Sequence, residues 1–286
     1  MNEGVIATCR AFLDTLPPKE KNALLNFLSK DALDDLQRAP LMSRDLTKGI
    51  PSKEEELSNI HATWIAPLMR TLPKGEIGLF LSALSQESVK ELQSLLLFTN
   101  HIPSPSALGR VFLRKTLMEM VSKEERCPPD CLPAHPLNQL LSLSMKDVLS
   151  FIDLLSMHDL AVEVRTIIGA AKLKAIYEVL TKPQYTLLQT ITHAKEPVVF
   201  RHPLLKNWSG DPTILQVQLR ERGLNRLAKA LVDLHPDLLW HLAHHLDVQH
   251  GEKLISFCTP LDTPRISELL IKQATSLLAS MQGAQL

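Results

Sequence analysis

Short runs of apolar residues at helical spacing, separated by breaks that contain proline, dominate this sequence. Near the N-terminus, Val5, Cys9 and Phe12 recur every three to four residues, and the pair Pro17 and Pro18 ends that run. Such spacing places apolar side chains on one face of an α-helix. Nowhere do two adjacent stretches of alternating polarity meet at a hairpin signal. We therefore predict an all-α protein of stacked short helices, as in armadillo-like α-solenoids.

The amino-acid composition favours helices and excludes several classes of function. Gly is scarce, with 10 among 286 residues, and the chain holds two Tyr and three Trp. This mixture favours helices packed through aliphatic side chains. Lys plus Arg and Asp plus Glu each number 31, so we expect no general attraction to nucleic acid or acidic lipid. We find no secretory signal pattern, no apolar run of the roughly 20 residues that span a membrane, and no disulfide scaffold among four Cys. These features predict a cytoplasmic protein that needs no cofactor.

Prolines and polar linkers divide the chain into five predicted parts. An N-terminal helical segment with its linker spans 1–50, and a helical module follows at 51–125. In that module, Ser52 and Glu55 form a capping-box pattern that predicts a helix to about Arg70. Residues 126–136 contain four prolines, through which no helix continues. Further helical modules are expected at 137–206 and 207–286.

Two segments of the sequence align without a gap. One begins at His61 and reads HATWIAPLMRTLPKGEIGLFLSAL, and the other begins at His235 and reads HPDLLWHLAHHLDVQHGEKLISFC. Each predicts a helix, a tight turn and a second helix. A two-helix unit cannot bury its apolar face alone, whereas stacked units can. The alternative is a chance match between two Leu-rich helices.

The first of these segments also carries a family resemblance. Residues 61–92 contain His61 at a predicted helix start, the step Ile65-Ala66 and the stretch Leu81-Ser82-Ala83-Leu84. In these features the segment resembles the middle domain of the flagellar motor switch protein FliG. That family shows a Glu-His-Pro-Gln motif, of which the His alone is present here.

Residues 140–180 resemble the start of the C-terminal domain of the same family. They share a Leu-Leu-x-Leu stretch, a helix with a polar start and the triplet Asp159-Leu160-Ala161. With 213–260, the likeness covers somewhat under half of the chain. In FliG the next helix carries charged side chains that meet the stator, whereas here Lys182 is the one formal charge between Thr181 and His193.

The resemblance therefore implies a FliG-like protein without a torque function. Its closest counterpart in type III secretion systems is the accessory subunit of the cytosolic sorting platform, the SctK class. The implied partners are the cytosolic domain of a secretion ring and platform subunits, with no nucleic acid and no direct membrane insertion. The predicted function is a non-enzymatic scaffold that links the inner-membrane ring to the platform. The alternatives are a flagellar-type motor switch component and a metal-dependent hydrolase.

One possible metal site lies in the Pro-rich segment. Cys127, Cys131 and His135 have the residue types that bind zinc, but a structural site needs a fourth ligand, which His101 or His158 would have to supply. The favoured interpretation is a Pro-rich loop with incidental cysteines.

A second possible metal site lies in the histidine-rich stretch between His241 and His250. His241 and His245 stand four residues apart, on one helix face. The metalloprotease pattern His-Glu-x-x-His is absent, because Leu242 occupies the place of the Glu. A partly exposed helix is favoured over a metal site.

Other sequence signals of chemistry are weak. We find neither a Gly-x-Ser-x-Gly motif nor a Gly-rich phosphate loop. Arg220, Arg222, Arg226 and Lys229 form a basic helix face. The interleaved Glu221 and the lack of aromatic residues favour a solvated surface over a nucleic-acid site.

Five residues are the candidates for partner binding: His61, Trp64, Trp208, His235 and Trp240. Trp64 and Trp240 lie inside the repeated helices and either pack in a core or anchor a partner helix. Trp208 lies in a predicted loop and is the aromatic residue most expected to be exposed. The alternative for Trp208 is a loop held to the body of the protein by one aromatic side chain.

Overall fold

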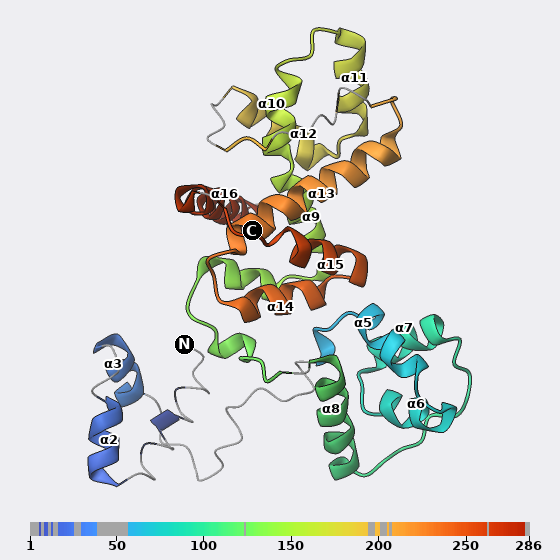
Figure 1. The fold of residues 1–286 in the computed structure, drawn as a ribbon, viewed down its shortest axis with the longest axis vertical. Coiled ribbons are helices and arrows are strands. Elements are labelled where there is room, and N and C mark those ends of the chain that lie inside the picture. Colours follow the sequence, from blue (N-terminus) through green and yellow to red (C-terminus); the bar gives the residue numbers. More distant parts are fainter. Residues whose placement is uncertain are drawn as a thin grey trace. The chain divides into compact units, whose positions relative to one another are not determined.

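The computed structural model describes most of the chain beyond residue 56. The described residues are 18–25, 30–38, 57–122, 124–193, 198–200 and 208–283 except Asp262, with single residues at 6, 9, 10, 13, 17 and 205. Within these ranges the regular elements are all helices (Figure 1), so the all-α prediction is confirmed. The predicted linker before residue 52 and the capping-box pair Ser52 and Glu55 lie outside the described residues.

Two short helices are described near the N-terminus, after helical residues at 6, 9, 10 and 13. Helix α2 spans Pro18–Leu25 and α3 spans Lys30–Arg38. Pro18 begins α2, a position where proline's missing N–H has no intrahelical role. Ile6, Leu13 and Leu36 form a small core there.

Four helices follow: α5 (Ala62–Arg70), α6 (Lys74–Leu81), α7 (Gln86–Leu96) and α8 (Ala107–Val121). Helix α5 packs against α7 and α8, and α6 packs against α8. The predicted long helix that ends at Arg70 is wrong in its start, because a turn at Asn59 and Ile60 precedes α5. His61 caps the new helix, as described below.

The chain folds as two compact units, Met1–Ala134 and His135–Leu286. The boundary falls inside the predicted Pro-rich linker, where the 3₁₀ turn η2 (Pro129–Cys131) is the regular element. The two modules predicted at 137–206 and 207–286 lie in the same unit.

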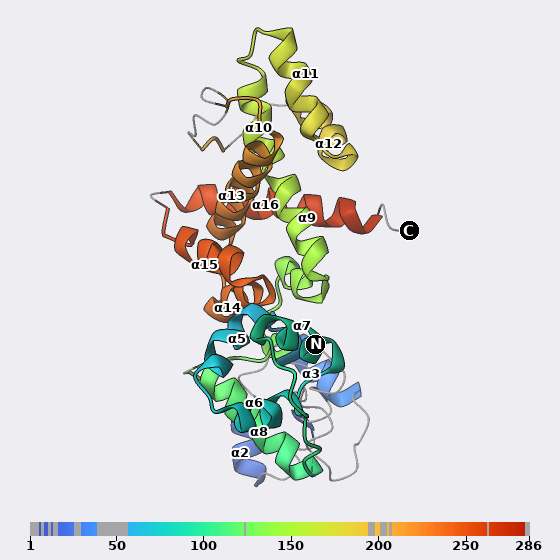
Figure 2. The same ribbon diagram turned by 90° about the vertical axis from the view of Figure 1, so that its right-hand side faces the viewer.

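The second unit begins with the 3₁₀ segment η3 (Pro136–Ser142) and the helices α9 (Met145–Leu155), α10 (Met157–Val164), α11 (Ala170–Val179) and α12 (Lys182–Thr192). It continues with α13 (Pro212–Leu231), α14 (Pro236–His245), α15 (Val248–Phe257) and α16 (Pro264–Gly283). Helix α13 packs against α9, α15 and α16, and α10 packs against α12 (Figure 2). The 20-residue α13 therefore organises this unit, with Leu215, Leu219, Leu224 and Leu227 fully buried along it.

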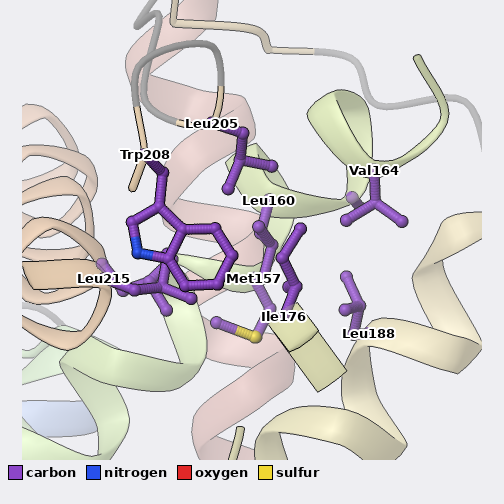
Figure 3. Packing of buried hydrophobic residues seen from close by; sticks show 10 residues of the cluster. Met157, Leu160, Val164, Ile176, Leu188, Leu205, Trp208 and Leu215 are labelled. Atoms are coloured by element: carbon purple, nitrogen blue, oxygen red, sulfur yellow. The ribbon is translucent and has the colours of Figure 1, made fainter. Parts of the chain in front are cut away.

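A core of the second unit lies between α10, α11, α12 and the start of α13. Buried side chains from all four helices meet there, with Leu205 and Trp208 from the connection before α13 (Figure 3). The core residues labelled in the figure are Met157, Leu160, Val164, Ile176, Leu188, Leu205, Trp208 and Leu215. This core holds α11 and α12 in place, and those helices carry the groove described below.

The two aligned segments form helix pairs that pack differently. Helix α14 packs against its successor α15, whereas the main partners of α5 are α7 and α8. The correspondence between the segments therefore lies in their local structure, and above all in their first residues.

Candidate partner-binding surfaces

The two histidines predicted to bind partners are helix caps. The Nδ1 atom of His61 accepts a hydrogen bond from the backbone N–H of Thr63 at 3.2 Å, and Nδ1 of His235 accepts from Asp237 at 3.2 Å. His135 caps η3 in the same way, through the backbone N–H of Leu137 at 3.2 Å. The first N–H groups of a helix lack partners within the helix. The Nδ1 atoms of these histidines accept a hydrogen bond from such an N–H group, which gives the histidines a structural role.

The two tryptophans inside the aligned helices are half-buried. The Trp240 ring stacks on His244, with ring centroids 4.0 Å apart and planes at 23°. It also meets His241 edge to face, at 5.1 Å between centroids. Trp64 lies on α5 with intermediate burial. Both rings keep part of their surface exposed, so both predictions stay open.

The prediction that Trp208 is an exposed contact residue is wrong. Its side chain is 8 % exposed, and the ring lies beside Leu215 and Met157 (Figure 3). The indole N–H donates to the backbone oxygen of Asp211 at 2.7 Å. Burying a large aromatic ring with its polar atom satisfied stabilises the fold. Trp208 therefore holds the preceding segment to the core, the alternative that the sequence left open.

The possible metal ligands of the histidine-rich stretch have other partners. Nε2 of His245 lies 3.0 Å from the backbone oxygen of Leu143. Nδ1 of His250 lies 2.5 Å from a carboxylate oxygen of Asp247. Within the described part of the chain, no group of three or more His, Cys, Asp or Glu side chains is arranged to hold a metal ion.

The possible ligands of the Pro-rich segment likewise have other contacts, and the pKa of one of the thiols is raised. The Cys127 thiol lies 3.7 Å from the backbone oxygen of Pro128. Partial burial raises the pKa of the Cys131 thiol, with Asp130 and Cys9 adding to the effect. Burial also lowers the pKa of His135, whose Nδ1 is the cap acceptor described above. A raised thiol pKa disfavours the thiolate that zinc requires.

The predicted solvated basic face of α13 is wrong for two of its arginines. Arg222 and Arg226 are buried, and Arg220 is half-buried. Each pairs with a carboxylate from α9 or α10. The pairs are Arg220 with Asp153 at 2.5 Å, Arg222 with Glu163 at 2.6 Å and Arg226 with Asp159 at 2.8 Å. Arg222 and Arg226 therefore hold the interior of the unit together, and the half-buried Arg220 is engaged by Asp153.

Arg226 links four parts of the second unit. Its side chain is 1 % exposed and pairs with Asp159 of α10. It donates further hydrogen bonds to the backbone oxygen of Val198 and to Gln273 of α16, both at 2.7 Å. Its guanidinium also lies 5.5 Å from the ring centre of Phe200. A planar guanidinium with five donors suits such a junction.

Helix α8 presents an apolar stripe to solvent in the first unit. Leu108, Val111 and Phe112 are 80 %, 58 % and 67 % exposed. Their spacing of three and four residues places them on one helix face. On the same helix, Leu117 is fully buried and Met118 nearly so, so α8 is anchored by one face while the other remains apolar. Clustered exposed apolar side chains of this size mark interaction sites.

An open groove of about 680 Å³ lies between α11 and α12 in the second unit. Its apolar lining includes Leu173, Tyr177, Leu180 and Tyr185. The two tyrosine rings meet edge to face, with centroids 5.4 Å apart. Grooves of this kind, apolar with aromatic side chains, receive helices or other apolar segments of a partner.

A smaller pocket of about 340 Å³ between α13 and α15 has several charged residues in its lining. Its charged lining residues Arg220, Glu221, His250 and Lys253 are paired, Arg220 with Asp153, His250 with Asp247, and Lys253 with Glu221. A charged ligand would have to displace these pairs, so the groove and the apolar stripe are the better candidates for a functional site.

No protein-family model, no curated protein and no solved structure matches this chain. In the described part of the chain, every helix is too short or too polar to traverse a lipid bilayer.

Proposed function

We propose that this protein is a non-enzymatic adaptor at the cytosolic base of a type III secretion apparatus. In this role it links an inner-membrane ring to the cytosolic sorting platform and lies in the cytoplasm, peripheral to the membrane. The observation that carries the adaptor role is the apolar stripe of α8. An enzyme would need converging reactive groups, whereas an adaptor needs apolar surface on a firmly held element.

The stripe has the character of a helix-docking surface. Leu108 and Phe112 are one helical turn apart, and Val111 lies between them on the same face. Partner helices bind such stripes through their own residues at the same spacing. Arg114 ties α8 to the body of the unit, because its Nε–H donates to the backbone oxygen of Ala83 at 2.6 Å.

The secretion setting rests on the resemblance to FliG. Helix α12, which follows the Asp159-Leu160-Ala161 triplet and α11, contains one charged residue, Lys182. A stator contact of the flagellar kind depends on complementary charges. The near absence of charge on α12 supports an accessory role over a motor role.

Affinity purification of the full-length protein from its native cell tests this proposal. We expect secretion-ring or platform subunits to co-purify with the wild type and to be lost with Phe112→Asp, which places a charge in the stripe. Leu97→Asp is the matched control, because Leu97 is 87 % exposed outside α8 and its left-handed backbone, with φ of 52°, tolerates Asp. Recovery of no secretion component with the wild type would contradict the secretion setting.

A further inference from the structure

We propose that the groove between α11 and α12 binds an amphipathic helix of a partner protein that carries Asp or Glu beside its apolar face. This inference goes beyond the adaptor role, because it assigns a second site in the other unit and the chemistry of its occupant. It does not depend on the stripe of α8 or on the secretion setting.

The floor of the groove has the spacing and chemistry of a helix-binding surface. Leu173, Tyr177 and Leu180 follow one another at intervals of four and three residues and are all half-buried. Tyr185 completes the floor from α12, held against Tyr177 by the edge-to-face ring contact. Tyrosines are enriched where partner side chains bind, because they offer a large rigid apolar surface with one polar tip.

The charges at the rim select an acidic occupant. The lining residues include Lys174, Lys182 and Glu178, which gives two positive charges and one negative charge, a net of +1. Lys174 and Glu178 face each other at 3.9 Å, and both are largely exposed, so this pair is weak. Lys182 pairs with no carboxylate among the described residues. A carboxylate on a bound helix would satisfy it.

The position of Lys182 makes an external carboxylate still more favourable. It is the first residue of α12, so its ammonium lies at the positive end of the helix dipole. An anionic group placed beside that end of the helix interacts favourably with both the dipole and the ammonium. Lys172 of α11 differs from Lys182, since its ammonium donates to the backbone oxygen of Leu205 at 2.5 Å.

The local geometry argues against a small free anion as the ligand. Anion sites at helix N-termini use free backbone N–H groups. In the first turn of α12, Pro183 has no N–H, and the backbone N–H of the N-cap Thr181 donates to Oε1 of Gln184 at 2.8 Å. The attraction therefore comes from lysine side chains above an apolar floor, which suits a helix with acidic flanks.

Selection from a display library of amphipathic helices, with the full-length protein as target, tests the proposal. The apolar face of the library is held constant, and its flanking positions vary among Glu, Lys and Gln. We expect the wild type to enrich Glu at the flanks. The double variant Lys174→Glu, Lys182→Glu should enrich Lys instead and bind the wild-type-selected helices about tenfold more weakly. Because both lysines are exposed, the fold is retained, which a thermal melt verifies.

The control is a lysine-to-glutamate substitution far from the groove in sequence. Lys146→Glu reverses an exposed lysine in the first turn of α9 and should leave the Glu preference unchanged. Absence of any enriched helix would overturn the proposal, as would equal enrichment of Glu by the double variant. Self-association of the wild type that the double variant abolishes would identify a second copy of this chain as the occupant instead. None of these results bears on the α8 stripe, so the two proposals fail separately.

Discussion

Gly223 of α13 lies directly against the backbone carbonyl of Ile152 in α9. A Cβ atom at position 223 would come 1.8 Å from the Ile152 oxygen and 2.7 Å from its carbonyl carbon. The two helices therefore cross with their backbones in contact, and glycine is required at this point because it has no side chain. The ion pair between Arg220 and Asp153 lies beside the same crossing.

Replacing Gly223 with Ala should destabilise the second unit severely. The added methyl group meets backbone, which cannot rotate away, so α13 must shift from α9. We expect a loss of at least about 3 kcal/mol in the free energy of unfolding, measured by urea denaturation. Gly75→Ala is the control. Gly75 lies in α6, and a Cβ atom there would have no heavy atom within 4 Å, so the stability of that variant should be unchanged or slightly higher. Equal stability of the two variants would show that the close crossing is absent.

The contributions of Arg226 and Asp159 to stability should depend strongly on each other. Both side chains are 1 % exposed, so removing either partner leaves an uncompensated buried charge. Arg226→Met and Asp159→Leu should each cost about 3–5 kcal/mol, whereas the double variant should cost far less than their sum. Urea unfolding of the four proteins of this cycle measures the coupling. Additive losses would mean that the pair is open to solvent.

Trp208 should contribute to the free energy of unfolding of the second unit. Trp208→Ala removes a buried ring and its hydrogen bond to Asp211, with an expected loss of about 3–5 kcal/mol. Trp208→Phe keeps most of the apolar contact and should lose less. A wild-type-like melting curve for Trp208→Ala would restore the prediction of an exposed contact residue.

The pH dependence of stability should carry a contribution from Asp247. Burial raises the pKa of this carboxyl, but hydrogen bonds from the His250 side chain and from the backbone N–H groups of His250 and Gln249 outweigh it, and the net pKa is lowered. The unfolded state then takes up the proton first, so this contribution is complete above the ordinary pKa of about 4 and is lost as pH falls through the lower folded pKa.

Asp247→Asn isolates that contribution, because Asn caps a helix as well as Asp does and α15 keeps its N-cap. We expect the variant to be less stable than the wild type at pH 7, with the difference shrinking as pH falls below about 4. Urea midpoints at a series of pH values provide the measurement. A difference that stays constant with pH would mean that the Asp247 charge makes no net contribution.

Three of the helix starts were predictable from the sequence because their caps are local. Ser85, Ser106 and Ser144 each accept a backbone N–H of the following turn, and the serine before each apolar run signals that arrangement. The end of α7 was less predictable. The helix stops at Leu96 because Leu97 adopts a left-handed conformation, which leucine rarely does and which no sequence signal announces.

The buried arginines could have been inferred in part. Arg222 stands three and seven residues after the buried Leu219 and Leu215, so it falls on the apolar face of α13. Asp159 likewise lies within the apolar stretch of α10. Two opposite charges on apolar faces indicate a buried pair. Which of them meet depends on the crossing of α13 with α9 and α10, and a single sequence does not specify that.

The candidate sites could not be predicted from the sequence, because they too depend on how the helices pack. The groove depends on Tyr177 and Tyr185 meeting across the turn between α11 and α12. The α8 stripe is hidden because Leu108 and Phe112 have the same spacing as core residues, and burial alone separates the two cases.

Crosslinking mass spectrometry in the native cell tests the adaptor proposal most directly. Lys115 lies on α8 beside the apolar stripe and is exposed, so an amine-reactive reagent reports what sits on that surface. The proposed role predicts crosslinks from Lys115 to a secretion-ring subunit or to a platform subunit, and their loss with Phe112→Asp. Crosslinks from Lys115 that reach proteins unrelated to secretion, and persist in Phe112→Asp, would contradict it.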